Sequence, residues 1–421
     1  MATDNNKKIR VYADWKELDG MKLMGILNTQ RVRGKEVFSF EYAADWLNSD
    51  NAQNLDPNLQ LYQGKQFAPD DKPNFGLFLD SSPDRWGRML MRRREAAMAK
   101  KGKRPEQTLF ESDYLLGVFD KHRLGGLRFK LDEQGDFLNN QKEFATPPWT
   151  SLRELEYASM QIEKDDAGDD PEYFKWLSML IAPGSSLGGA RPKASVLDEK
   201  KNLWIAKFPS IADEKDSGAW EKVLHELAGK AGIKVPEAKL MHFTGKHHTY
   251  LSKRFDRTGK EKRIHFASAM TLLGYNDGAS AEQGISYLEL VEFIQRNSPE
   301  SKNDLEELWR RIVFNILVSN TDDHLRNHGC ILTPAGWRLS PAYDMNPNPY
   351  GTGLSLNISE TDNALDTDVA MSVAKYFKLS TKEADRILGE IQKAVKEWRT
   401  VAKANEISKS EIEEMKNAFR V

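Results

Sequence analysis

The sequence has 421 residues, enough for two or three domains that each bury a core. Hydrophobic residues make up 39% of the sequence and charged residues 29%, and this composition excludes an intrinsically disordered chain. The 61 Lys and Arg residues nearly balance the 63 Asp and Glu residues. The resulting formal net charge of −2 excludes the overall basic surplus of a nonspecific nucleic-acid binder.

The sequence predicts a cytoplasmic protein without a membrane segment. Cys330 is the single cysteine, so no intramolecular disulfide can form, and residues 1–8 lack the apolar stretch of a signal peptide. A bilayer-spanning helix needs about 18 uncharged apolar residues. The apolar run Ile312–Val318 is far shorter than this and contains Asn315.

The first part of the chain is typical of a small β-rich module, which we place at residues 1–148. Alternating runs at 8–13 and 36–42 predict β-strands, and residues 116–119 and 124–129 predict a second β pair. Ser82-Pro-Asp between these strands indicates the start of a helix that continues through residues 89–98.

The rest of the chain predicts a mixed section at residues 149–257 and a mostly helical section at residues 258–421. Two helices are expected between residues 151 and 180, separated by an acidic connector, and a hairpin is expected from two apolar runs at 193–197 and 203–208. Helical periodicity then dominates at 286–295, 305–318 and 381–418. The absence of repeated βαβ units argues against a Rossmann sheet or a TIM barrel.

The segment Asn320-Thr-Asp-Asp-His-Leu-Arg-Asn327 lies between a predicted helix and a predicted strand. Asp322 and Asn327 have the spacing of the kinase catalytic loop, in which the Asp accepts the proton of the attacking hydroxyl and the Asn binds a metal ion. An Asp and an Asn at this spacing also occur as helix caps and turn residues. A hairpin that follows leads to Asp344, whose carboxylate is a second oxygen ligand suited to Mg²⁺, with a turn cap as the alternative role.

Further kinase-like elements precede this loop. The glycine-rich segment Gly184–Lys193 is not a Walker A motif, but its backbone N–H groups can approach phosphate oxygens. Trp204-Ile-Ala-Lys207 resembles the kinase strand whose Lys holds the α- and β-phosphates, and Glu221, or Glu226 as a weaker alternative, is its expected ion-pair partner. The strand 250–256 ends in Asp256, where a hinge between two lobes would contact adenine and ribose.

These residues resemble the HipA-type serine/threonine kinases, the toxins of bacterial toxin–antitoxin systems. The resemblance rests on five segments and on residues 83–88 and 125–128 of the N-terminal module; the five are Ser186–Lys193, Ala206–Pro209, Lys253–Arg257, Asn320–Asn327 and Ala342–Asp344. It implies an α+β, protein-kinase-like fold with two lobes, of which the C-terminal lobe is mostly helical, preceded by the β-rich module.

The resemblance assigns a role to each site residue. It implies Asp322 as the catalytic base, Asn327 and Asp344 as Mg²⁺ ligands, Lys207 as the phosphate anchor, and the backbones of Lys253 and Phe255 as adenine contacts. With the motifs above, the expected ATP-binding residues are Ser186, Gly188, Gly189, Ala190, Lys193, Lys207, Glu221, Lys253, Phe255 and Asp256. Ser186, or the adjacent Ser185, is the expected autophosphorylation site that would silence the enzyme.

The resemblance also implies partners. Well-known members of the family phosphorylate an aminoacyl-tRNA synthetase and are neutralised by a DNA-binding antitoxin. We therefore expect a protein acceptor, a HipB-type antitoxin, contact with DNA only through that antitoxin, and a role in persistence. No zinc site is expected, because the histidines lack a metal-ligand spacing such as H-E-x-x-H.

The sequence departs from related patterns at three places. Asn320-Thr321 stands where eukaryotic kinases have His-Arg, Asp323 is an alternative catalytic base, and Arg191-Pro192 replaces a Gln-Glu pair that is frequent in the family. Two other functions stay open: a small-molecule phosphotransferase, and a catalytically weak corepressor bound to the antitoxin. The N-terminal module favours a protein kinase over the first, and the four kinase-like residues argue against the second.

Overall fold

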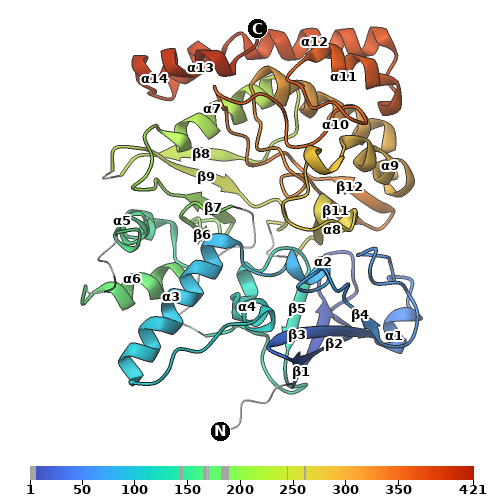
Figure 1. The fold of residues 1–421 in the computed structure, drawn as a ribbon, viewed down its shortest axis with the longest axis vertical. Coiled ribbons are helices and arrows are strands. Elements are labelled where there is room, and N and C mark those ends of the chain that lie inside the picture. The colour runs from blue at the N-terminus through green and yellow to red at the C-terminus, as the bar shows by residue number, and fades with distance from the viewer. Residues whose placement is uncertain are drawn as a thin grey trace. The chain divides into compact units, whose positions relative to one another are not determined.

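The computed structural model describes residues 6–141, 146–164, 168, 170–181, 189–243, 245–259 and 262–421. The internal contacts of the chain define two compact units. The N-terminal unit comprises residues 1–211 and 256–267, and the C-terminal unit comprises residues 212–255 and 268–421. The chain runs from blue to red through them in Figure 1.

The N-terminal unit is built on a five-stranded antiparallel sheet with the strand order β4-β3-β2-β1-β5. Its strands are β1 (Asn6–Ala13), β2 (Lys22–Val32), β3 (Lys35–Tyr42), β4 (Gln66–Phe67) and β5 (Leu127–Lys130). Strands β1 to β4 lie side by side in Figure 1. Ile9, Val11 and Ala13 alternate into the core, as expected for a strand with one buried face. The predicted strands at 8–13 and 36–42 are confirmed.

Residues 116–119 do not form the predicted strand. They lie at and just after the end of helix α4 (Glu111–Gly117), whose start is capped by Asp113, which accepts a hydrogen bond from the Phe110 N–H. The fully buried Arg123 then donates to the carbonyls of Leu115 and Val118, at 2.8 and 3.1 Å. A guanidinium therefore satisfies the carbonyls that a neighbouring strand would otherwise have to satisfy.

The other helices of the N-terminal unit are α1 (Ala44–Leu47), α2 (Gly76–Leu79), α3 (Arg85–Gly102), α5 (Leu152–Ile162) and α6 (Tyr173–Ile181). Helix α3 begins where Ser-Pro-Asp predicted a helix start, since Asp84 accepts a hydrogen bond from the Gly87 N–H at 2.8 Å. The two helices predicted between residues 151 and 180 are α5 and α6. Their acidic connector lies partly outside the described residues.

The predicted hairpin is confirmed as β6 (Lys193–Leu197) paired with β7 (Leu203–Lys207). This hairpin belongs to the N-terminal unit, although the sequence placed it in a separate section beginning at residue 149. The Trp86 indole donates to the Lys193 carbonyl at 3.2 Å, and the Leu197 N–H donates to the Pro147 carbonyl at 3.1 Å. These bonds tie the hairpin to the preceding module.

His265 is a buried histidine of the N-terminal unit. Its ring stacks on Trp15 with a centroid distance of 4.9 Å, and its Nδ1 accepts a hydrogen bond from the Gly126 N–H at 3.4 Å. Burial lowers the pKa of His265 from 6.5 to about 3, because the protonated ring would lose its hydration.

We expect His265 to make the protein less stable at acidic pH. Below about pH 6.5 the unfolded chain takes up a proton at this residue, whereas the folded chain does so only near pH 3. The free energy of unfolding should therefore fall by about 2 kcal/mol between pH 7 and pH 5 through this site alone. Guanidinium unfolding of wild type and His265→Gln at both pH values tests this, and identical pH slopes for the two proteins would contradict it.

The C-terminal unit is mostly helical, with two antiparallel hairpins. The hairpins pair β8 (Ala238–Met241) with β9 (Thr249–Lys253), and β11 (Gly329–Thr333) with β12 (Gly336–Leu339). The helices are α7 (Ser217–Lys230), α8 (Ala269–Leu272), α9 (Tyr287–Asn297), α10 (Ser301–Leu317), α11 (Thr367–Val373), α12 (Thr381–Val395), α13 (Trp398–Ala404) and α14 (Lys409–Glu414), and β10 (Phe266–Ser268) leads into the unit. The three regions of predicted helical periodicity are confirmed.

Helix α10 forms the centre of this unit. From Leu305 to Leu317 nearly all of its side chains are buried, including the charged Arg310 and Arg311. The segment around residue 420 packs near the end of this helix. Trp398 stacks on Phe419 with a centroid distance of 4.2 Å, and Arg420 donates from its N–H to the Leu317 carbonyl at 2.9 Å and from Nε to the Ser319 hydroxyl at 3.1 Å.

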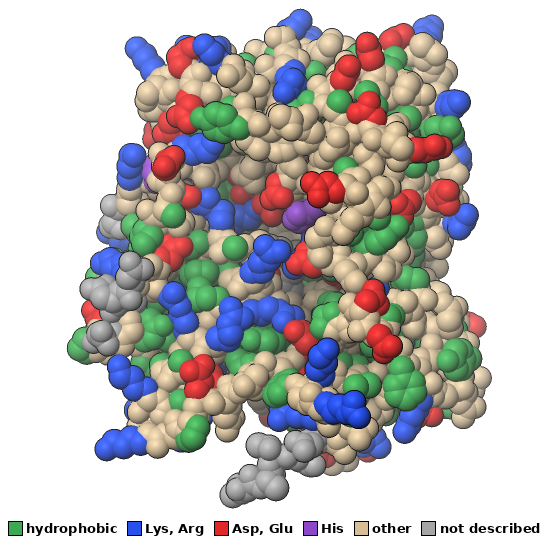
Figure 2. All heavy atoms as spheres, viewed as in Figure 1, with side chains coloured by type: hydrophobic (Ala, Val, Ile, Leu, Met, Phe, Trp, Pro, Cys, Tyr) green, Lys and Arg blue, Asp and Glu red, His purple; other side chains and the backbone are tan. Residues whose placement is uncertain are grey.

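The surface carries charges of both signs. Figure 2 shows Lys and Arg side chains interspersed with Asp and Glu and with apolar side chains, which agrees with the net charge of −2. Among the described residues, no helix combines the length and the apolar character that a membrane span requires.

Candidate active site

The segment predicted as a catalytic loop follows α10 and is held by hydrogen bonds on several sides. Asn320 Nδ2 donates to Asn315 Oδ1 at 3.0 Å, and Asn320 Oδ1 accepts from the Asn346 N–H at 3.1 Å. Asn348 Nδ2 donates to the Thr321 hydroxyl at 2.9 Å. Asn320 and Thr321, which replace the His-Arg of eukaryotic kinases, thus fix the start of the loop.

The two adjacent carboxylates of this loop have opposite environments. The Asp322 side chain is 85% exposed, whereas the Asp323 side chain is 5% exposed. Asp323 accepts hydrogen bonds from the Tyr287 hydroxyl and Asn315 Nδ2, and its Oδ1 lies 2.9 Å from His328 Nε2. Burial alone would raise the pKa of Asp323, but the charge of His328 and the hydrogen bonds outweigh burial and hold this pKa below its usual value. Asp323 therefore stabilises the loop, and Asp322 faces solvent.

Asn327 has the environment expected of a metal ligand. Its side chain is buried, and its Nδ2 donates to the Asp322 carbonyl at 2.8 Å, which orients the amide. Its Oδ1 has no hydrogen-bond partner within the part of the chain that the structure describes. A buried amide oxygen without a partner costs about 1–3 kcal/mol, and a cation or a water bound at this oxygen would remove that cost.

Asp344 lies in a strained backbone conformation next to the loop. Its φ of +58° is in the left-handed region, where a residue other than glycine costs roughly 1–2 kcal/mol. The preceding Tyr343 donates from its hydroxyl to the Arg326 carbonyl at 2.8 Å, and the Ser340 N–H donates to the Gly329 carbonyl at 2.9 Å. The structure therefore brings the segments of Asn327 and Asp344 side by side.

Asn327 Oδ1 and the Asp344 carboxylate are two candidate oxygen ligands, as expected for a Mg²⁺ site. They are too few to enclose a metal ion by themselves. Mg²⁺ in phosphotransfer sites takes one or two protein oxygens and completes its octahedron with water and phosphate. The described ranges contain no group of three or more His, Cys, Asp or Glu side chains able to hold a metal by themselves.

Glu221, on helix α7, belongs to the same region of the C-terminal unit. Its side chain is buried, and Tyr250, on β9, lies near both Glu221 and Asp344. Burial, followed by the negative charges of Glu221 and Asp344, raises the pKa of Tyr250 well above its usual value. Glu226, the weaker alternative, forms an ion pair with Lys222 at 2.8 Å on the same helix.

The expected adenine and ribose contacts differ in their surroundings. The Lys253 N–H donates to the Glu237 carbonyl at 2.8 Å, and the Phe255 ring lies 5.7 Å from the ring of Tyr343. Asp256 is buried in the N-terminal unit, where its Oδ2 accepts from the Gly125 N–H at 3.0 Å and pairs with Arg257 at 2.6 Å. A ribose hydroxyl would compete with these partners for the Asp256 carboxylate.

The glycine-rich loop is described only at its end. Ser185, Ser186 and Gly188 lie outside the described residues. Gly189 has a φ of +96°, which a side chain would disfavour, and Ala190 follows it on an exposed turn.

The two lysines of the hairpin differ in accessibility. Lys193 is buried and forms an ion pair with the equally buried Asp84 at 2.9 Å, whereas Lys207, opposite Lys193 in the hairpin, is half-buried. Lys193 thus supports the hairpin from within the N-terminal unit. Lys207 lies in this unit and Glu221 in the other, so their ion pair stays a prediction.

The residues that hold the loop 320–327 in place were not predicted. Asn315, Tyr287 and His328 come from three separate segments and meet at Asp323. Only Asn315 left a signal in the sequence, as an amide within the apolar run Ile312–Val318.

Comparisons with known proteins identify relatives of the chain. It is 28% identical over 191 residues to a protein of Haemophilus influenzae named as a candidate kinase, and 26% identical over 190 residues to the serine/threonine-protein kinase toxin HipA of Shewanella oneidensis. These matches cover 40% and 39% of this chain, and 54% and 43% of the two relatives. The chain therefore spans about half the length of these relatives.

The solved complex of Shewanella oneidensis HipA, HipB and operator DNA contains a chain of similar fold, with a TM-score of 0.62 and 17% identity. The similarity covers 97% of this chain and 94% of that chain, and it confirms the expected α+β kinase-like fold. The family model described as the HipA-like C-terminal domain matches residues 185–398, just over half of the sequence. The chain belongs to the HipA-like C-terminal domain family.

Proposed function

We propose that this protein is a serine/threonine protein kinase of the HipA type that uses ATP and Mg²⁺. The observation that carries the proposal is the arrangement of the loop 320–327, on which Asp322 is exposed and Asn327 keeps a buried amide oxygen without a hydrogen-bond partner among the described residues. The strained Asp344 lies on the adjacent segment. The sequence similarity to a kinase toxin supports the same activity.

Each residue has a distinct role in this proposal. The oxygen of the acceptor hydroxyl attacks the γ-phosphorus, and ADP leaves. The Asp322 carboxylate accepts the proton of that hydroxyl. Asn327 Oδ1 and Asp344 would hold Mg²⁺, which when bound neutralises charge on the β- and γ-phosphates. Lys207 binds the phosphates, and Asp323 keeps the loop in place through its buried hydrogen bonds.

The partners belong to the proposal as well. The similar Shewanella oneidensis chain was solved with HipB and operator DNA, which supports a HipB-type antitoxin for this protein and contact with DNA through it. We propose a protein acceptor, with an aminoacyl-tRNA synthetase as the first candidate. Autophosphorylation at Ser186 or Ser185 would place a dianion in the glycine-rich loop and compete with ATP phosphates for cationic groups.

Intact-mass spectrometry tests the proposed function. Wild type and Asp322→Asn are incubated with Mg-ATP, alone and with a purified aminoacyl-tRNA synthetase, and any added phosphate is mapped. Phosphate on the loop serines or on the synthetase with wild type alone supports the kinase. ATP consumption that depends on a metabolite would instead indicate a small-molecule phosphotransferase, and absence of ATP binding would indicate a corepressor.

The Lys207→Ala variant should bind ATP about tenfold more weakly, because the ammonium that pairs with the phosphates is lost. Titration with a fluorescent ATP analogue measures the affinity. Lys200→Ala is the matched control, since Lys200 is exposed in the turn of the same hairpin and should leave the affinity unchanged. Equal affinity of Lys207→Ala and wild type would assign Lys207 a structural role.

A further inference from the structure

A second concave site lies within the N-terminal unit. Its volume is about 390 Å³, in the range of small-ligand pockets, and every lining residue belongs to this unit. The lining comes from segments far apart in the sequence: the turn between β1 and β2, Lys121 and Arg128, the outer end of the β6–β7 hairpin, and residues 257–263.

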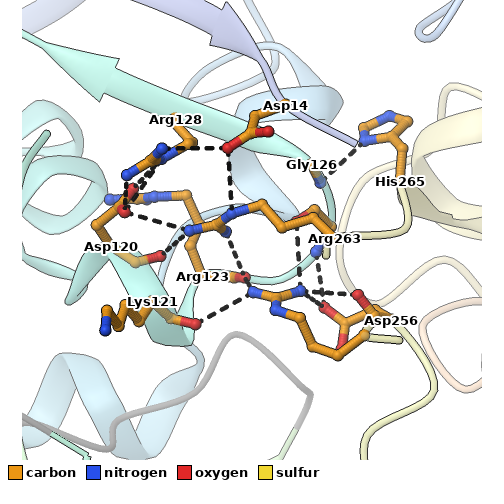
Figure 3. Close-up of polar contacts among 11 residues, drawn as sticks. Asp14, Asp120, Lys121, Arg123, Gly126, Arg128, Asp256, Arg263 and His265 are labelled. Carbon is orange, nitrogen blue, oxygen red and sulfur yellow. Dashed lines mark hydrogen bonds and ion pairs between the residues drawn. The ribbon is translucent and has the colours of Figure 1, made fainter. Parts of the chain in front are cut away.

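The floor of the pocket is a network of Arg and Asp side chains, which Figure 3 draws together with neighbouring contacts. Arg128 pairs with Asp14 at 3.1 Å and with Asp120 at 2.6 Å, and Arg263 pairs with Asp120 at 3.2 Å. Burial would raise the pKa of Asp120, but the charges of Arg263, Arg128 and Arg123 and the hydrogen bond from Arg128 outweigh burial and hold this pKa below its usual value. The carboxylates of Asp14 and Asp120 therefore fix the positions of Arg128 and Arg263.

The rim of the pocket carries a surplus of positive charge. Lys121, Lys201 and Lys262 line it from three separate segments, and all three side chains are exposed. Within the described residues none of the three has a carboxylate at ion-pair distance, whereas Lys16 at the same rim pairs with Glu17 at 3.3 Å. Three cations that converge on one hollow, with no described carboxylate to balance them, favour a negatively charged ligand.

The walls of the pocket indicate the kind of anion. Trp15, Leu18 and Leu203 add an apolar surface beside the cationic rim. A phosphate group suits the lysines as point charges, and a small organic body suits the apolar wall. We propose that this pocket binds a small phosphorylated metabolite.

This pocket is lined by other residues than the nucleotide site. The comparison rests on the proposed function, which assigns the nucleotide site. Of the residues assigned to ATP or Mg²⁺ that the structure describes, none lines it. Leu197 and Leu203 line the pocket at one end of the β6–β7 hairpin, whereas Lys193 and Lys207 pair at the other end, about 13 Å away by strand geometry. A ligand in the pocket therefore needs neither Mg²⁺ nor Lys207.

Isothermal titration calorimetry of the full chain with phosphate, pyrophosphate and phenyl phosphate, in EDTA and without nucleotide, tests the proposal. We expect wild type to bind at least one probe, and the Lys121→Gln/Lys201→Gln/Lys262→Gln variant to bind it at least tenfold more weakly. The control Lys8→Gln/Lys35→Gln/Lys65→Gln removes three equally exposed lysines of the same unit and should bind like wild type.

Two further variants separate the pocket from the nucleotide site. Lys207→Ala should keep its affinity for the probe, and the triple pocket variant should keep phosphate transfer. No binding by wild type at 10 mM probe, or equal binding by wild type and the triple pocket variant, would overturn the pocket proposal while leaving the kinase proposal in place. If wild type bound the probe but transferred no phosphate, the kinase proposal would be overturned and the pocket proposal would stand.

Discussion

Replacing Asp322 by Asn should lower the rate of phosphate transfer by about 10²–10⁴-fold while leaving the affinity for ATP unchanged. The amide cannot accept the proton of the acceptor hydroxyl, but it keeps the size of the carboxylate. Because the Asp322 side chain is 85% exposed, the substitution should not disturb the fold. Single-turnover transfer from Mg-ATP and titration with a fluorescent ATP analogue measure the two quantities separately.

Two variants make this result specific. Glu360→Gln neutralises another exposed carboxylate of the C-terminal unit and should transfer phosphate at the wild-type rate. Asp344→Asn should weaken the Mg²⁺ dependence of nucleotide binding, which Asp322→Asn should not. Transfer by Asp322→Asn within threefold of wild type would refute its role as the base.

The Asp84→Ala variant should lose about 3–5 kcal/mol of stability through the buried ion pair, and about 1 kcal/mol more through the helix cap. The Asp84 and Lys193 side chains are 0% and 1% exposed, and they pair at 2.9 Å. Without this carboxylate the ammonium of Lys193 stays buried beside an apolar methyl group, which is costlier than losing an exposed ion pair. Guanidinium unfolding followed by tryptophan fluorescence measures the loss.

A cap variant and a double variant identify the cause. Asp366→Ala removes the exposed Asp cap of α11 and should cost only about 1 kcal/mol. Asp84→Ala/Lys193→Met removes both charges and should recover part of the stability lost in the single variant. If Asp84→Ala cost no more than Asp366→Ala, the buried ion pair would not stabilise the protein.

Local patterns predicted much of the fold. The hairpins at 193–207 and 329–339 follow from short apolar runs separated by a turn, and the start of α3 follows from an Asp cap. These signals lie within a few neighbouring residues. The strand predicted at 116–119 failed because Arg123 satisfies that backbone from within the core. The apolar pattern of residues 116–119 carries no information about this contact.

The sequence predicted which residues belong to the candidate site. It did not predict which of them are buried or which partners they contact. The spacing to Asn327 favoured Asp322 over Asp323 in the sequence, but only the meeting of Tyr287, Asn315 and His328 at Asp323 shows that this second carboxylate is buried. The burial of Lys193 likewise depends on Asp84, more than 100 positions earlier. Burial of a polar group is decided by partners remote in the chain, and spacing within a motif does not encode them.

The bonds from Arg420 to Leu317 and Ser319 join parts of the chain that are made about 100 residues apart. The ribosome makes the end of α10 about 100 residues before Arg420, so Leu317 and Ser319 lack these bonds until translation reaches the segment around residue 420. A growing chain would therefore complete the packing at the end of α10 only when its synthesis reaches Arg420.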